Sequence, residues 1–152
     1  MVQSIEVVPA QPDLNQGLTI SVNIANNGDS GAFEFSTALC VDPPSPPTSF
    51  DNKLNGYASQ DTLELIAGGT QVLTFSHPGF GTSGSHTLYA QVDAGSALFP
   101  VQVLGCAVQE SNEANNISDS TISVGATPTP TNTPTPTNTS TPTPSATPTD
   151  TP

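Results

Sequence analysis

The chain has 152 residues and a formal net charge of −12, because it contains thirteen aspartate and glutamate residues, one lysine and no arginine. So few cations exclude nucleic-acid binding and electrostatic attraction to anionic lipid. No apolar run approaches the roughly 20 residues that span a membrane, and the first ten residues lack the basic and apolar regions of a secretory signal peptide.

The composition of the chain changes at Ala126. The last 27 residues hold 8 of the 16 prolines and none of the 12 glycines, and most of them are threonine or proline. Residues 1–125 have the apolar content of a globular domain but few charged side chains. We therefore expect one folded domain, 1–125, followed by a low-complexity tail or linker, 126–152.

Alternation of apolar and polar residues with period 2 predicts short β-strands throughout the domain. In chain order they lie around Ile5 and Val7 and then at 18–25, 33–41, 70–75, 87–92 and 122–124. About seven strands separated by turn residues predict an all-β fold, an antiparallel β-sandwich. The side chains expected to face its core are Leu18, Ile20, Val22, Ile24, Phe33, Phe35, Leu39, Val41, Leu73, Phe75, Leu88, Ala90, Val92, Ile122 and Val124.

In the tail, threonine occupies every odd position from 127 to 143. A segment without apolar surface does not fold alone, and its prolines favour an extended polyproline-II-like conformation. Ser/Thr-Pro composition is typical of O-glycosylated stalks, and the simpler alternative is a bare spacer. The candidate O-glycosylation sites are Thr127, Thr129, Thr131, Thr133, Thr135, Thr137, Thr139, Thr141 and Thr143.

The end of the domain carries a pattern in two parts. Asp93 follows Gln91-Val92, and the block Val108-Gln109-Glu110-Ser111-Asn112-Glu113-Ala114-Asn115-Asn116 comes later. This pattern resembles the CARDB family, the cell-adhesion-related domain found in bacteria, and the resemblance covers roughly residues 3–124. It implies an immunoglobulin-like antiparallel β-sandwich of a secreted or cell-surface protein. Residues 94–107 depart from the family as a partly apolar insertion between the two parts of the pattern.

The chain contains two cysteines, Cys40 and Cys106. Strand alternation places Cys40 on the outward face of its strand, and Cys106 lies in the insertion. In the immunoglobulin-like sandwich that the resemblance implies, the strands of Cys40 and Tyr89 are neighbours, and the insertion follows the Tyr89 strand. We therefore predict a Cys40–Cys106 disulfide that holds the insertion over the outer face of this sheet. Two free thiols, or pairing with another chain, are the alternatives.

The densest group of oxygen-bearing side chains belongs to the same pattern. Asparagine and aspartate commonly satisfy backbone groups in turns, so a structural turn is the favoured interpretation. Oxygen ligands at loop spacing could instead hold calcium, although no EF-hand spacing is present and no other cofactor is expected. The residues concerned are Asp93, Glu110, Asn112, Glu113, Asn115 and Asn116.

Catalysis is not expected from this sequence. His77 and His86 are its two histidines, and no nucleophile-elbow or oxyanion motif accompanies the Ser85, His86 and Asp93 that could compose a triad. Zinc would need more ligands at suitable spacing. Asn116 and Asn138 begin N-x-Ser/Thr sequences and are candidate N-glycosylation sites.

The function predicted from these features is that of a non-catalytic extracellular module, structural or adhesive, on a Thr/Pro-rich stalk at the cell surface of a prokaryote. One form of this hypothesis is a subunit of an extracellular filament, since exposed strand edges can accept a strand from a neighbour. The expected partners are other copies of the chain or neighbouring surface-protein domains, with glycans as a further candidate. The alternative is a carbohydrate- or protein-binding accessory domain of a larger secreted enzyme.

Overall fold

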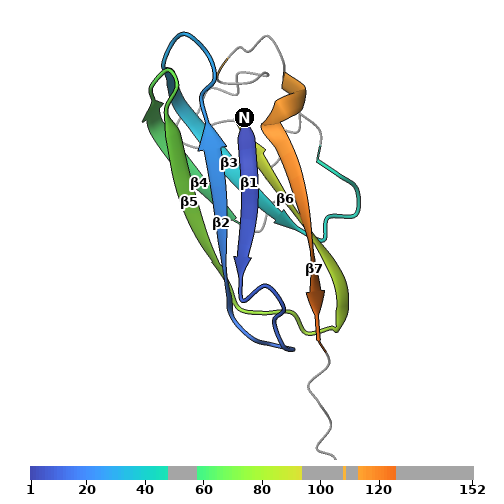
Figure 1. Ribbon diagram of the computed structural model, residues 1–152. Helices are drawn as coiled ribbons and strands as arrows, with labels where there is room; N and C mark the ends of the chain where they lie inside the picture. Colours follow the sequence, from blue (N-terminus) through green and yellow to red (C-terminus); the bar gives the residue numbers. More distant parts are fainter. Residues whose placement is uncertain (48–57, 94–107, 109–112, 126–152) are drawn as a thin grey trace, which may run out of the picture.

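Two antiparallel β-sheets pack face to face in the computed structural model, which describes residues 1–47, 58–93, 108 and 113–125 (Figure 1). The first sheet has the strand order β1-β2-β5 and the second β4-β3-β6-β7. Their bounds are β1 (Val2–Val8), β2 (Leu18–Ala25), β3 (Ala32–Val41), β4 (Ala58–Leu65), β5 (Thr70–His77), β6 (Gly84–Val92) and β7 (Ile117–Val124), with a 3-10 helix, η1 (Glu113–Asn116), before β7.

This topology confirms the predicted immunoglobulin-like sandwich. In constant-type immunoglobulin domains the fourth strand pairs with the sheet of the first two strands. Here β4 pairs with β3 instead, in a register that places Leu39 opposite Ala58 and Phe35 opposite Thr62. The second sheet therefore has four strands, and β4 forms one of its edges.

The core lies between the sheets and is built by the alternation that the sequence shows. Every second residue of β2, from Leu18 to Ile24, is buried, and β6 contributes Leu88, Ala90 and Val92. Fourteen of the fifteen side chains predicted for the core belong to its buried cluster or pack against it. The exception is Phe33.

Phe33 was predicted to face the core, and this prediction is wrong. Its side chain is 55% exposed, whereas Phe35 and Leu39 of the same strand are buried. The next residue, Glu34, has a φ of 54°, in the left-handed region that a β-strand residue rarely adopts. This conformation breaks the period-2 alternation, so Ala32 packs against the core and Phe33 points to solvent.

Strand β4 was not among the strands predicted individually. Its sequence, ASQDTLEL, is mostly polar, and its burial pattern is irregular because only Thr62 and Leu65 are buried. An edge strand with one partner needs few apolar side chains, so hydrophobic alternation is a weak signal for it. Its pairing with β3, which is buried on both faces from Phe35 to Cys40, defines it instead.

The chain enters and leaves the sandwich at opposite ends. β1 and β7 lie beside each other and run in the same direction, so that the N-terminus and the end of β7 are separated by the length of the strands (Figure 1). A parallel bridge between Asp13 and Gly125 holds the end of β7, where the Gly125 amide donates to Pro12 O at 3.0 Å.

Candidate functional site

The end of the sandwich at which the N-terminus lies is closed by Asn26. Its Nδ2 donates to Leu65 O at 2.9 Å and to Ser30 O at 2.8 Å, which ties the β2–β3 turn to the end of β4. Its backbone also bonds to the β4–β5 turn through Gly68 and Gly69. The N-terminal ammonium group donates to Ala25 O at 2.9 Å.

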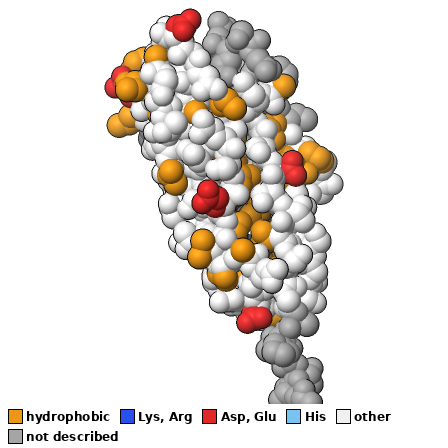
Figure 2. Space-filling view, viewed as in Figure 1, with side chains coloured by type: hydrophobic (Ala, Val, Ile, Leu, Met, Phe, Trp, Pro, Cys, Tyr) orange, Lys and Arg blue, Asp and Glu red, His pale blue; other side chains and the backbone are white. Residues whose placement is uncertain are grey.

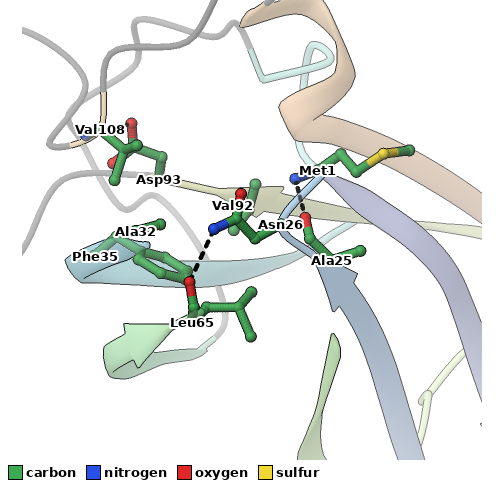
Figure 3. A pocket seen from close by; sticks show the side chains of 9 residues that line it. All are labelled: Met1, Ala25, Asn26, Ala32, Phe35, Leu65, Val92, Asp93 and Val108. Carbon is green, nitrogen blue, oxygen red and sulfur yellow. Dashed lines mark hydrogen bonds between the residues drawn. The ribbon is translucent and has the colours of Figure 1, made fainter. Parts of the chain in front are cut away.

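These contacts surround a small cavity between the sheets (Figure 3). Its volume of about 20 Å³ is enough for about one water molecule. A monosaccharide does not fit in that space. It is lined by Met1, Ala25, Asn26, Ala32, Phe35, Leu65, Val92, Asp93 and Val108.

Asp93, the first residue of the predicted oxygen-rich group, lies beside this cavity. It is buried directly after β6, with a φ of 57°, and its Oδ2 accepts a hydrogen bond from the Val108 amide at 3.1 Å. A left-handed backbone and a carboxylate that accepts a main-chain N–H are the contacts of a turn residue. Since Gln91 pairs with Ile117, Asp93 and η1 lie at the same end of the sheet.

The other members of the group are only partly placed. Asn115 and Asn116 lie in η1 together with the backbone of Glu113, while Glu110 and Asn112 lie outside the described residues. Within the described part of the chain, no three His, Cys, Asp or Glu side chains are close enough to hold a metal ion. Calcium binding by the six residues of this group stays a prediction.

Cys40 lies on β3 opposite Tyr89 of β6, so the two strands are neighbours as predicted. Its side chain points away from the core but is only 7% exposed, and its outer-face neighbours Ser36, Ala38 and Gln91 are also buried. Cys106 lies outside the described residues, and the Cys40–Cys106 disulfide therefore stays a prediction.

Most of the candidate glycosylation sites also lie outside the part of the chain that the structure describes. Thr127 to Thr143 and Asn138 lie outside the described residues. Asn116 is only 2% exposed, so a glycan on its amide would require this turn to open. The described residues contain no helix long and apolar enough to cross a membrane.

The opposite end of the sandwich holds an ion pair that sequence reasoning missed. Asp42 follows β3, and its carboxylate accepts hydrogen bonds from His86 Nδ1 at 2.5 Å and from the Thr87 amide at 2.7 Å. His86 Nε2 lies 3.0 Å from Thr82 O. Because both ring nitrogens have acceptors, the geometry favours the protonated imidazolium and leaves neither nitrogen free to act as a general base.

Phe80 stacks between the two histidines of the chain. Its ring centroid lies 4.0 Å from that of His86 and 4.6 Å from that of His77. His77 Nδ1 accepts a hydrogen bond from the Gly79 amide at 3.1 Å. The three rings hold the β5–β6 loop against the sandwich, so both histidines have structural roles in the described molecule.

The two histidines titrate in opposite directions. Burial lowers the pKa of His77 below 6.5. Burial also opposes charge on His86, but the hydrogen bonds to Asp42 and Thr82 outweigh it and raise its pKa above 6.5. Burial raises the pKa of Asp42, and the bonds from His86 and Thr87 more than compensate, so that its pKa lies below 3.8.

These shifts predict a pH-dependent contribution to stability. The raised pKa of His86 means that its contribution is complete below pH 6.5 and is lost as the pH rises through that raised pKa. We expect the melting-temperature difference between wild type and His86→Gln to be larger at pH 5.5 than at pH 8.5. The contribution of the charged pair to the free energy of unfolding is on the order of 1 kcal/mol or less, because the Asp42 side chain is 45% exposed to solvent.

The control for this titration is His77→Gln, for which the trend should reverse, since protonating His77 disfavours the folded state. Thermal unfolding followed by circular dichroism at both pH values measures each difference. A His86 difference that stays constant, or grows toward pH 8.5, would contradict the assignment of a charged Asp42–His86 pair.

Comparison with known proteins adds the family. A family model described as CARDB matches residues 1–120. Among curated proteins, no match was found.

Two archaeal structures are similar over most of their length. A CARDB domain from Pyrococcus furiosus, in complex with di-metal ions, is 20% identical, with a TM-score of 0.57 over 82% of this chain and 89% of that one. A domain of a Methanosarcina acetivorans protein, whose description proposes a cell surface protein, is 19% identical, with a TM-score of 0.50 over 82% and 93%.

The same fold also occurs inside a larger enzyme. A β-glucosidase from Erythrobacter marinus matches with 15% identity and a TM-score of 0.51, over 82% of this chain but only 15% of the enzyme. At such identities these likenesses concern the fold alone. They show that the sandwich occurs both as a separately solved domain and as a small part of a larger chain.

Proposed function

The chain belongs to the CARDB family, an adhesion-related family of non-catalytic modules found in surface-associated proteins, and on this premise we propose that it is a structural and adhesive spacer at the outside of a prokaryotic cell. In this role the folded domain separates and presents what lies before and after it in a longer assembly. In this role the domain sets a distance and binds a partner, and it catalyses no reaction.

The observation that carries this proposal is the placement of the start of β1 and the end of β7. β1 begins at one end of the sandwich and β7 finishes at the other (Figure 1). Eight-residue strands span about 25 Å, so each such domain would add about that length to a chain that passes through it. Domains whose ends lie close together would add almost none, which makes this arrangement suited to spacing.

The stalk and the disulfide are the finer parts of the proposal. The Thr/Pro-rich residues 126–152 serve as an O-glycosylated stalk, in which attached sugars keep the chain extended. Cys40 and Cys106 form a disulfide that holds the insertion 94–107 on the outer face of β3. The buried position of Cys40 on that face supports this pairing.

Assembly into an extracellular filament is a further form of the same role, supported by the edge strands of the two sheets. The alternative is an accessory domain of a larger secreted enzyme, which the fold of the β-glucosidase segment illustrates. Electron microscopy of native material separates filaments from monomers, and uniform monomers under assembly conditions would eliminate the filament form.

Intact mass spectrometry of native material tests the stalk and the disulfide together. We expect a ladder of hexose-sized additions and, after enzymatic removal of the glycans, a mass about 2 Da below that of the reduced chain. The Cys40→Ser variant is the control for the disulfide, since it should show no such deficit. A native sample at the unmodified, fully reduced mass would refute both assignments.

A further inference from the structure

Three large apolar side chains are exposed where β3 begins and β4 ends. Phe33, Leu63 and Ile66 are 55%, 71% and 63% exposed. Phe33 pairs in register with Glu64, and both the Phe33 ring and Glu64 Oε1 approach Gly31, so these two side chains lie on the same face of the sheet. Leu63 precedes Glu64 on β4, and Ile66 follows the end of that strand. We call these three side chains the corner patch. In Figure 2 hydrophobic atoms lie beside carboxylates at the corner formed by β4 and β5.

The backbone is arranged to expose the aromatic member of the patch. Ordinary alternation would bury Phe33, and the left-handed φ of 54° at Glu34 turns it outward. Such a conformation is unfavourable for a residue with a β-carbon, and strained residues of this kind concentrate at functional sites. The Phe33 ring also lies close over Gly31, where a β-carbon would come within 3.0 Å of it. The ring therefore covers the main chain at Gly31 while more than half of it faces solvent.

The charge around the patch identifies the kind of partner. Glu34 and Glu64 flank the apolar side chains, and both residues are exposed. The described residues include no lysine or arginine, because the lysine of the chain is at position 53. A second copy of the chain would therefore bring like charges to the patch. A partner with lysine or arginine beside apolar side chains complements it.

The edge of β4 indicates the conformation of that partner. β4 is an edge strand, so a further extended segment can pair with its main chain while its alternate side chains contact the patch. We propose that the corner patch and the adjacent edge of β4 dock an extended protein segment in which apolar and basic residues alternate. This inference rests on the proposed role as an adhesive module, because that role requires a binding partner.

The test uses synthetic ten-residue peptides and the full ¹⁵N-labelled chain, followed by NMR. A peptide of alternating valine and lysine should perturb residues 31–35 and 61–66. Phe33→Ser and Leu63→Ser should each weaken its binding at least about tenfold, as truncation of a central contact does. The matched control is Val8→Ser, because Val8 is 66% exposed but ends β1 at the opposite end of the sandwich, and the affinity of this variant should stay that of wild type.

Three results would overturn the proposal. The first is equal affinity for a serine–lysine peptide, which would reduce the interaction to charge. The second is no binding of the valine–lysine peptide, or binding that neither patch variant weakens. The third is a wild-type dimer in sedimentation that Phe33→Ser dissociates, which would make a second copy the occupant. None of these results bears on whether the protein is exposed at the cell surface, so the proposed function is tested separately.

Discussion

Replacing Leu39 by alanine is expected to lower the free energy of unfolding by about 2–5 kcal/mol. Leu39 is buried without measurable exposure on the central strand β3, between Ala58 of β4 and Ala90 of β6. Both flanking partners are small, so neither can extend into the space that a truncated side chain leaves. The cost therefore includes a cavity as well as the lost transfer of the leucine side chain out of water.

The matched control for this change is Leu63→Ala. It removes the same atoms from a side chain that is 71% exposed, so its effect should stay within about 0.5 kcal/mol. Urea unfolding of both variants measures the difference. If the two substitutions cost the same, the core would not lie between the sheets as described.

Replacing Gly79 by alanine should be the most damaging change in the loops. Gly79 has a φ of 112°, and a β-carbon there would lie 2.6 Å from both the carbonyl carbon of Asn15 and the oxygen of Gln16. These are main-chain atoms, so relief requires the loop around Asn15 to move away. That movement would break the hydrogen bond from the Asn15 amide to Phe80 O, 2.8 Å long, and loosen the stacked rings. We expect a loss of about 3 kcal/mol or more.

Gly84→Ala is the control for this prediction. Gly84 has a similar φ of 123° but no atom within 4 Å of its β-carbon position. It should therefore show only the backbone strain of about 1–3 kcal/mol. Chemical unfolding of both variants isolates the contact. If both variants lost the same stability, Gly79 would not pack against the main chain of Asn15 and Gln16 as the structure has it.

Much of the fold could be predicted because its strands follow the simplest rule of β-structure. From Leu18 to Ile24 the alternation is unbroken, and every predicted inward residue of that strand is buried. The rule fails at Phe33, because one left-handed residue reverses the two faces and a sequence of ordinary residues gives no sign of it. It also fails at β4, whose stability comes from pairing with β3 rather than from its own apolar side chains.

The sites were harder to predict than the strands. Asp42 and His86 are 44 positions apart in the chain, and their pairing depends on the register of β3 with β6, which the sequence does not show. The family pattern marks Asp93, and the structure gives this residue a hydrogen bond from the Val108 amide, a contact typical of a turn residue. Nothing in the sequence indicated the corner patch, since an apolar residue in a strand normally predicts a side chain in the core.

Surface labelling of intact cells that produce the protein tests the central claim most directly. An antibody against the folded domain should bind cells that have not been permeabilised, and added proteinase K should remove that signal while a cytoplasmic marker stays intact. Binding that appears only after permeabilisation, with the domain protected from the protease, would contradict a role as a structural and adhesive module outside the cell.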